Sequence, residues 1–292
     1  MKKELGTGFR EIGLYANTDK PESIALAVEC AKELQKMGIK TPFLSRQADE
    51  YFVQGSELLP KDEFFSRPDC IIVLGGDGTL LSVARLASST GMPLFGINTG
   101  KLGFLTEGEG REFKKLLDEL VSGETWVDPR MMLECTAELY DGRVENFTAL
   151  NDVVVKNGCM RMMEFNVCAD GQKLALFRAD GLIVSTPTGS TAYSLAAGGP
   201  IIHPRADVLT VTPIAPQHLH DRPFVLPGDT VLTMSFQKKE HSIIVSMDGQ
   251  REIYVNGQDE IIIRRSDRTA NLIRLKNSNV YERIRKKLFY EE

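Results

Sequence analysis

The sequence predicts an α/β protein in which an N-terminal domain with a doubly wound parallel sheet precedes a β-rich antiparallel C-terminal domain. Strand-like and helix-like segments alternate through about the first 125 residues, which is typical of a parallel sheet with helical crossovers. After Trp126, runs of alternating apolar and polar residues are separated by Asp-Gly and Asn-Gly pairs, which favour tight hairpins. The chain has 292 residues, enough for about two domains.

The first half contains two clear strand signals. Ile12–Ala16 is a short apolar run, and Cys70–Leu74 is a continuous apolar run bounded by Pro68 and Gly75. A run without polar interruptions is the pattern of a strand that is buried on both faces. A third strand is expected over residues 93–97, so the N-terminal sheet has at least three buried strands.

Helical segments lie between and after these strands. Asp19 is expected to cap a first helix that carries Pro21 in its first turn and ends near Gly38. Apolar residues recur between these points at helical spacing. The same pattern predicts helices over about residues 78–89, 112–121 and, at the end of the chain, 280–289.

The second half has the alternation of half-buried strands, as in the residues from Leu133 to Leu139. We expect hairpin turns, with positive φ at both central positions, at Asp141-Gly142, Asp170-Gly171, Asp248-Gly249 and Asn256-Gly257. The predicted organisation is an α/β domain over 1–126, a β-rich domain over 127–266, and a segment over 267–292 that packs on the first domain.

Composition excludes several classes of protein. With 35 basic and 40 acidic residues, the net charge of −5 argues against an extended nucleic-acid-binding surface. No apolar run reaches the roughly 18 residues of a membrane span, and the N-terminus lacks the apolar core of a signal peptide. The five cysteines are scattered and the four histidines form no metal motif, so we expect reduced thiols and a cytoplasmic protein.

The most informative local motif is Gly75-Gly76-Asp77-Gly78-Thr79, between a predicted buried strand and a helix. Ligands bind at this end of the strands in open α/β folds, and glycine lets a phosphate approach the backbone N–H groups. The Asp77 carboxylate would repel a bare phosphate, so it indicates a partner hydroxyl or Mg²⁺. The alternative is a tight turn in which Asp77 only caps the helix.

Two common phosphate-binding motifs are excluded. The dinucleotide fingerprint needs glycine at position 81, where Leu81 stands, and Gly96–Leu102 lacks the spacing and the hydroxyl residue of a P-loop.

Three further polar segments fit a nucleotide site or, equally, ordinary turns and caps: Asn151-Asp152, Arg178–Gly181, and the hydroxyl-rich Thr186–Ser194. In the last, Ser190 or Thr191 is expected to cap a helix that ends at Gly198-Gly199.

Together these segments closely resemble the bacterial ATP-NAD kinase family. The resemblance includes Gly96-Ile97-Asn98, Leu102-Gly103-Phe104-Leu105 and Gly199-Pro200-Ile201, and it runs from about Gly8 to beyond Gln250. The glycine-aspartate turn alone is weak evidence, because diacylglycerol kinases and phosphofructokinases have similar turns. The Thr186–Ser194 block behind the Asn-Asp pair is much more specific.

The resemblance implies an enzyme that transfers the γ-phosphoryl group of ATP to the 2′-hydroxyl of the adenosine ribose of NAD, with Mg²⁺ or another divalent cation. It implies Asp77 as proton acceptor, and a homodimer or homotetramer. Asp152 stands where the family more commonly has Glu, one methylene longer. The implied substrate-binding residues are Gly75, Gly76, Gly78, Thr79, Asn151, Asp152, Arg161, Arg178, Asp180, Thr188, Thr191, Ala192, Tyr193, Ser194, Leu195, Ala196 and Gln250.

Two other functions remain open at this point. A lipid or sugar kinase could use the same glycine-aspartate turn, although the hydroxyl-rich residues 185–194 do not suit a lipid pocket. A non-catalytic dinucleotide sensor would bind the ligand without consuming ATP. The sequence identifies no metal ligands.

Overall fold

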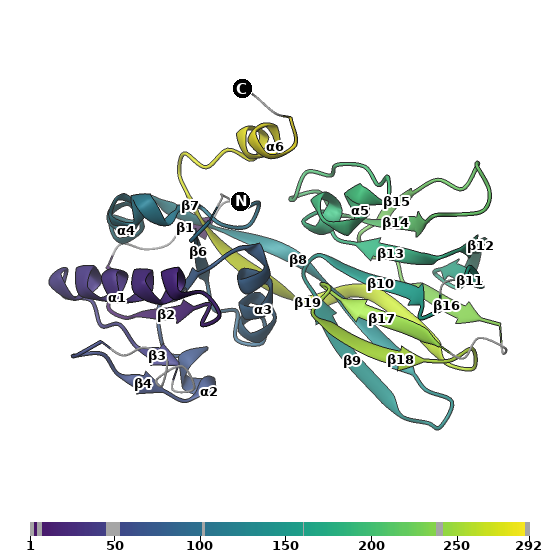
Figure 1. Cartoon of the computed structure of the whole chain (residues 1–292), viewed down its shortest axis with the longest axis horizontal. Coiled ribbons are helices and arrows are strands. Elements are labelled where there is room, and N and C mark those ends of the chain that lie inside the picture. The colour runs from purple at the N-terminus through teal and green to yellow at the C-terminus, as the bar shows by residue number, and fades with distance from the viewer. Residues whose placement is uncertain are drawn as a thin grey trace. The chain divides into compact units, whose positions relative to one another are not determined.

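The computed structural model describes residues 3–4, 8–44, 53–100, 103–159, 161–237 and 242–289. The chain divides into two compact units (Figure 1), one comprising Met1–Pro129 and Ala270–Glu292 and the other Arg130–Thr269. Two long strands, β8 (Thr125–Glu138) and β19 (Glu260–Leu275), contribute residues to both units.

The first unit is built on a parallel sheet. Its strands follow the order β4-β3-β2-β5-β6, and Leu272 of β19 pairs in parallel beside Leu94 of β6. The other elements of this unit are β1 (Lys3–Glu4), β2 (Ile12–Ala16), α1 (Pro21–Lys36), β3 (Phe43–Leu44), β4 (Leu58–Leu59), α2 (Lys61–Phe64), β5 (Cys70–Leu74), α3 (Asp77–Ala87), β6 (Leu94–Asn98), β7 (Gly108–Glu109), α4 (Phe113–Val121) and α6 (Val280–Leu288).

Helices cover both faces of this sheet, so the doubly wound prediction is confirmed. Cys70, Ile72 and Leu74 of β5 belong to one apolar cluster with the buried residues of α1 and α4. Alternate residues of a strand point to opposite faces. On the other face α3 packs so closely that a Cβ at Gly96 of β6 would lie 2.4 Å from the Leu80 side chain.

Most predicted elements of the first unit are confirmed, and one cap is wrong. Strands β2 and β5 have the predicted bounds, and Gly38 follows the end of α1 with a φ of +79°. The N-cap of α1 is Lys20 rather than Asp19. Asp19 is instead part of a turn in which its own N–H donates to Asn17 Oδ1 at 3.1 Å, which leaves it one residue short of the helix start.

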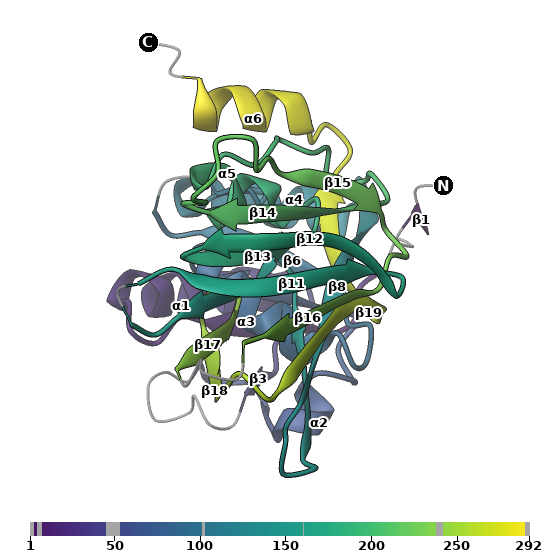
Figure 2. The same ribbon diagram turned by 90° about the vertical axis from the view of Figure 1, so that its right-hand side faces the viewer.

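The second unit is antiparallel, as predicted. One sheet has the order β15-β14-β13-β10-β17-β18, and β14 lies beside β13 in Figure 2. Strands β12, β11, β16 and β19 form a second antiparallel set, and β8 pairs with β9. The bounds are β9 (Val144–Ala149), β10 (Asp152–Asn157), β11 (Met163–Ala169), β12 (Gln172–Ala179), β13 (Gly181–Ser185), α5 (Tyr193–Ala196), β14 (Val208–Ile214), β15 (Phe224–Pro227), β16 (Leu232–Phe236), β17 (Ile243–Met247) and β18 (Arg251–Val255).

The four predicted turns differ in their outcome. Asp170-Gly171 is a two-residue hairpin with φ of 49° and 75°, and Asp248-Gly249 has φ of 53° and 63° in a longer loop. At Asp141-Gly142 only the glycine has positive φ. The prediction for Asn256-Gly257 is wrong: its backbone keeps negative φ, because Asn256 Oδ1 accepts a hydrogen bond from Gln258 N at 2.8 Å and closes an Asx-turn.

All five cysteines are unpaired. No helix in the ranges given above is both long and apolar enough to cross a membrane.

Candidate active site

The glycine-aspartate turn lies at the carboxyl end of β5, and α3 begins at Asp77 itself. Gly75 N donates to Ile97 O of the neighbouring strand at 3.0 Å. A Cβ at Gly75 would lie 2.5 Å from Thr79 Oγ1, so only glycine allows the first turn of the helix to approach the strand so closely. Asn17 at the end of β2 donates its Nδ2 to the same hydroxyl at 3.1 Å.

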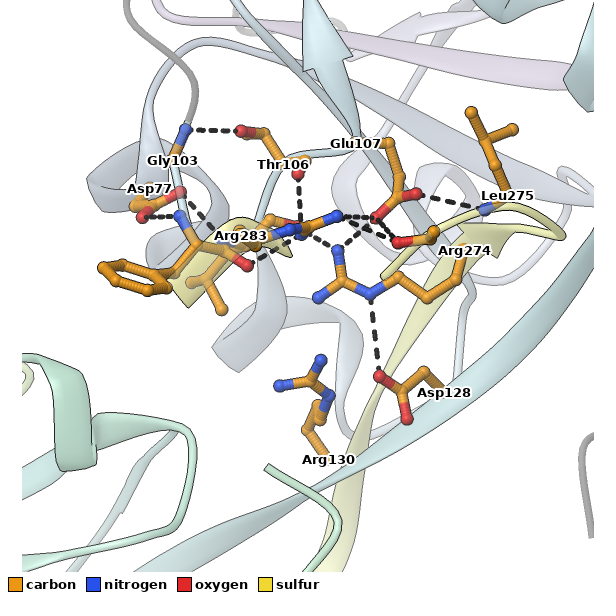
Figure 3. Close-up of polar contacts among 12 residues, drawn as sticks. Asp77, Gly103, Thr106, Glu107, Asp128, Arg130, Arg274, Leu275 and Arg283 are labelled. Atoms are coloured by element: carbon orange, nitrogen blue, oxygen red, sulfur yellow. Dashed lines mark hydrogen bonds and ion pairs between the residues drawn. The ribbon is translucent and has the colours of Figure 1, made fainter. Parts of the chain in front are cut away.

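Asp77 does not cap α3, so the alternative of a simple capped turn is wrong. Residue Gly76 occupies the N-cap position, and no side chain caps the helix. The carboxylate instead accepts hydrogen bonds from Phe104 N at 2.8 Å and from Leu105 N at 3.1 Å (Figure 3). A carboxylate has about four lone-pair directions. Asp77 is half-buried and is held by two donors while keeping further acceptor capacity.

The loop that holds Asp77 requires glycine at position 103. A Cβ there would lie 1.9 Å from Asp77 Oδ1 and 2.5 Å from its carboxyl carbon. Gly103 N donates to Thr106 Oγ1 at 3.1 Å, which closes the loop. The family resemblance includes this segment, Leu102–Leu105, without implying a role for its residues; Leu102 lies outside the described residues.

A buried ion cluster follows this loop directly. Glu107 is bonded to the guanidinium groups of Arg274 and Arg283 (Figure 3). Burial alone would raise the pKa of Glu107, but the two guanidinium groups hold that pKa below its ordinary value. No sequence pattern indicated these residues, since the two arginines are more than 160 positions away from Glu107 in the chain.

A polar cavity of about 260 Å³ lies beside the turn. Its lining includes Gly78, Thr79 and Ser82 from α3 and residues 15–19, which are the last two residues of β2 and the three that follow it. Gly78 is exposed to solvent. The carboxyl ends of two adjacent parallel strands therefore supply this cavity, as expected for a ligand site in an open α/β sheet.

In the second unit, three strand ends bring predicted site residues together. Strand β10 is antiparallel to both β13 and β17, with Asp152 opposite Ser185 and Val153 opposite Met247. The start of β10 therefore lies beside the ends of its two neighbours. This register gathers Asn151-Asp152, the segment from Thr186 onward and Gln250 at one end of the sheet.

Asp248 holds the Asn151-Asp152 turn. Its carboxylate accepts hydrogen bonds from Leu150 N at 3.1 Å, Asn151 N at 2.7 Å and Asp152 N at 3.3 Å. The sequence pattern indicated Asp248 only as a hairpin residue and gave no sign of this role. An acidic residue in a tight hairpin could have been the signal, because its carboxylate needs donors close by.

Asp152 has an unusual environment. Its side chain is only 4% exposed. Burial, and secondly the nearby Asp248 carboxylate, raise the pKa of Asp152 to about 7. Both the protonated and the ionised forms are therefore populated near neutral pH, so this carboxyl can donate or accept a hydrogen bond there.

The side chains of the hydroxyl-rich segment form hydrogen bonds within their own loop and do not cap a long helix. Thr186 donates its N–H to Asn151 O at 2.9 Å, and a Cβ at Gly189 would lie 2.1 Å from the same oxygen. The capping prediction is wrong, because α5 is a single turn whose N-cap is Ala192. The Ser190 hydroxyl donates to Pro187 O at 2.7 Å, and Thr191 donates to Thr188 O at 3.4 Å.

The remaining residues of this segment differ in exposure. Thr188 is buried and its hydroxyl accepts from Arg130 Nη1 at 3.1 Å, a buried arginine that sequence reasoning missed. Ser194 is buried and shares a hydrogen bond with Thr212. Tyr193 is 46% exposed. The other predicted members of the segment are Ala192 and Leu195, both half-buried, and Ala196, which is exposed.

Three predicted residues lie at the opposite end of β10 and β13. Arg161 follows the last residues of β10, and Asp180 precedes β13, where its carbonyl accepts from Asn157 N at 3.2 Å. Arg178 is exposed and its Nε lies 3.5 Å from Glu164 Oε2. Within this unit these side chains are thus not brought together with Asn151 and Asp152.

Comparison with known proteins covers nearly the whole chain. The models of the ATP-NAD kinase N-terminal and C-terminal domains match residues 12–125 and 150–275. An NAD kinase of Geotalea daltonii is 37% identical over 97% of this chain and all of its own length. An NAD kinase of Magnetococcus marinus is 39% identical over 97% of this chain and 95% of its own.

Solved structures give the same result. A yeast NADH kinase complexed with NADH has a TM-score of 0.84 and 25% identity, over 97% of this chain and 89% of that one. An NAD kinase from Archaeoglobus fulgidus in complex with ATP has a TM-score of 0.74 and 26% identity, over 95% and 98%. These matches support the NAD kinase interpretation over a lipid or sugar kinase, and the chain belongs to the ATP-NAD kinase family.

Proposed function

We propose that this chain, an ATP-dependent NAD kinase by its family, uses Asp77 to orient the 2′-hydroxyl of the adenosine ribose of NAD and to accept its proton. The hydroxyl oxygen forms a bond to the γ-phosphorus as the bond to the β–γ bridging oxygen breaks, giving NADP, ADP and one proton. The observation that carries this proposal is the Asp77 carboxylate, which two backbone N–H groups hold in place while it keeps lone pairs for a hydroxyl.

Phosphoryl transfer depends mainly on alignment and charge neutralisation. A carboxylate fixed before the substrate arrives supports alignment, because no ordering of the side chain is then needed during reaction. The hydroxyl becomes more acidic as it bonds to phosphorus, so its proton moves late. A positioned general base contributes on the order of 10²–10⁴-fold in rate.

A divalent cation is part of this proposal. Among the residues that the structure describes, no three His, Cys, Asp or Glu side chains gather as a metal site. Mg²⁺ is usually bound by one or two carboxylates together with substrate phosphates rather than by a protein cage. The donor set therefore fits Mg²⁺ carried by the triphosphate, with Asp77 as an acidic side chain that could join it. The cation would neutralise triphosphate charge.

We assign dinucleotide binding to the end of the six-stranded sheet where Asn151 and Asp152 lie. The register of β10, β13 and β17 supports this assignment, since it gathers these residues with Thr188 and Gln250. The NADH complex of the yeast relative supports a dinucleotide as ligand. The resemblance adds three further groups of substrate-binding residues to the proposal. These are Gly75, Gly76, Gly78 and Thr79 of the glycine-aspartate turn; Thr191, Ala192, Tyr193, Ser194, Leu195 and Ala196 of the hydroxyl-rich segment; and Arg161, Arg178 and Asp180, which lie at the opposite end of β10 and β13.

Assembly and location complete the proposal. We infer a homodimer or homotetramer, which sedimentation of the purified protein would measure. The five unpaired cysteines support a reducing compartment, and we place the enzyme in the cytoplasm.

The test is NADP formation by the purified protein from ATP, Mg²⁺ and NAD, followed with a dehydrogenase that accepts only NADP. Asp77→Asn and Asp77→Ala should fold, bind NAD and lose about 10²–10⁴-fold in kcat. Asp118→Asn, an exposed carboxylate on α4, is the control and should keep full turnover.

Three results would contradict the proposal. Near-normal turnover by either Asp77 variant removes Asp77 from the chemistry. NAD binding by the unaltered protein without any NADP formed would favour a sensor, and faster turnover of diacylglycerol or small sugars would favour another kinase.

A further inference from the structure

The loop that positions Asp77 is itself held from its other side. Residues 104–106 present two backbone N–H groups to the Asp77 carboxylate, and their three carbonyl oxygens all accept from Arg274 or Arg283. Arg283 Nη1 donates to Phe104 O and Thr106 O, both at 2.9 Å, and Arg274 Nη1 donates to Leu105 O at 2.9 Å. Figure 3 shows these contacts from α6 and β19 converging on the loop.

One peptide unit links Arg283 to Asp77 directly. The carbonyl of Phe104 and the N–H of Leu105 belong to the same planar group, and in a trans peptide they point in opposite directions. Arg283 binds the oxygen of this group, and Asp77 Oδ1 accepts its N–H at 3.1 Å. Because the plane is rigid, fixing its oxygen also fixes the direction of the N–H.

Glu107 keeps Arg283 in place. The second guanidinium nitrogen, Nη2, lies 2.9 Å from Glu107 Oε1 and 3.0 Å from Ser278 Oγ. The side chains are nearly inaccessible, with 1% exposure for Glu107 and 10% for Arg283. Both terminal nitrogens of the Arg283 guanidinium thus have two acceptors each. The planar group holds its donors in a fixed geometry, so Nη1 is suited to hold two carbonyls at once.

We propose that Arg283 of α6 is a positioning residue for Asp77, acting through the Phe104–Leu105 peptide unit, with Glu107 and Arg274 as its support. This inference rests on the proposed role of Asp77. The last helix of the chain thus contributes to catalysis without touching the substrate.

The test compares Arg283→Met and Arg283→Lys with Lys286→Met, which removes an exposed charge on the same helix. Lys286 pairs only with Glu282 at 2.7 Å among the salt bridges of the described residues. We expect Arg283→Met to lower kcat by about 10- to 100-fold with KM for NAD nearly unchanged, because misplacing a reacting group costs this much. Arg283→Lys should be intermediate, since an ammonium lacks the fork, and Lys286→Met should be normal.

A double-mutant cycle separates positioning from simple fastening of α6. In an Asp77→Asn background, Arg283→Met should cause no further loss of kcat, because both changes disable the same group. If Arg283→Met does not fold, Arg283→Lys, which keeps the charge against Glu107, replaces it in the cycle.

Unchanged kcat in a folded Arg283 variant, or losses that multiply in the cycle, would overturn the inference and leave Arg283 with a structural role only. A fully active Asp77→Asn enzyme is a different result: it would overturn the role proposed for Asp77 itself.

Discussion

Gly103→Ala tests whether the position of the Asp77 carboxylate decides the rate. The added Cβ would lie 1.9, 2.5 and 2.7 Å from the three atoms of that carboxyl group. A Cβ does not approach a non-bonded heavy atom this closely in real structures, so the carboxylate must turn away. It then loses its hydrogen bonds from Phe104 N and Leu105 N.

The expected magnitudes follow from these lost contacts. Hydrogen bonds to a charged group contribute about 1.5–3 kcal/mol each. Asp77 is half-buried and can turn to water, so we expect the free energy of unfolding to fall by about 2–3 kcal/mol rather than by the full sum. The kcat should fall about 10²–10⁴-fold, as for the Asp77 variants themselves.

NADP formation, NAD binding by calorimetry and urea unfolding would be measured for Gly103→Ala and for Gly100→Ala. The control lies in the same part of the chain, and among the described residues its added Cβ would meet only Asn98 Oδ1, at an ordinary 3.6 Å. In an Asp77→Ala background, Gly103→Ala should cost less than about 1 kcal/mol of stability, because the clashing group is gone. Normal turnover by Gly103→Ala would refute the reasoning.

Asp152→Asn should flatten the pH dependence of stability. With a pKa of about 7, above its ordinary value, folded Asp152 holds its proton through acidic pH. Its favourable contribution to the free energy of unfolding is complete below about pH 4 and is lost as the pH rises through 7, on the order of 2–4 kcal/mol. Urea unfolding at pH 5 and pH 8 would detect this loss. An equal change in the free energy of unfolding between these pH values in Asp152→Asn and in the unaltered protein would contradict the raised pKa of Asp152. Gly171→Ala should lower the free energy of unfolding by about 1–2 kcal/mol, because the φ of Gly171 is +75°, and it should leave kcat unchanged. Thermal unfolding and the NADP assay check these two expectations.

Local sequence was sufficient where neighbours along the chain carry the interaction. Strand β5 was predicted to the residue, because its apolar run ends abruptly at glycine. Asp170-Gly171 was also predicted, since positive φ at both residues is a property of the turn alone. The caps predicted at Asp19 and Ser190 were wrong for a different reason, because other residues nearby in the chain compete: Asp19 N–H binds Asn17 Oδ1, and the Ser190 hydroxyl binds Pro187 O.

The candidate active site also combines features set by local sequence with features set by tertiary contacts. The sequence by itself determined the family, the glycine-aspartate turn and its position after a buried strand, because these depend on residue order and local conformation. Only the tertiary structure decided what holds the acid. Its donors come from a loop 27 and 28 residues later, and the arginines that hold that loop come from the end of the chain. Hydrogen bonds between such distant residues leave no periodic pattern in the sequence, because they depend on how the sheet and the last helix pack.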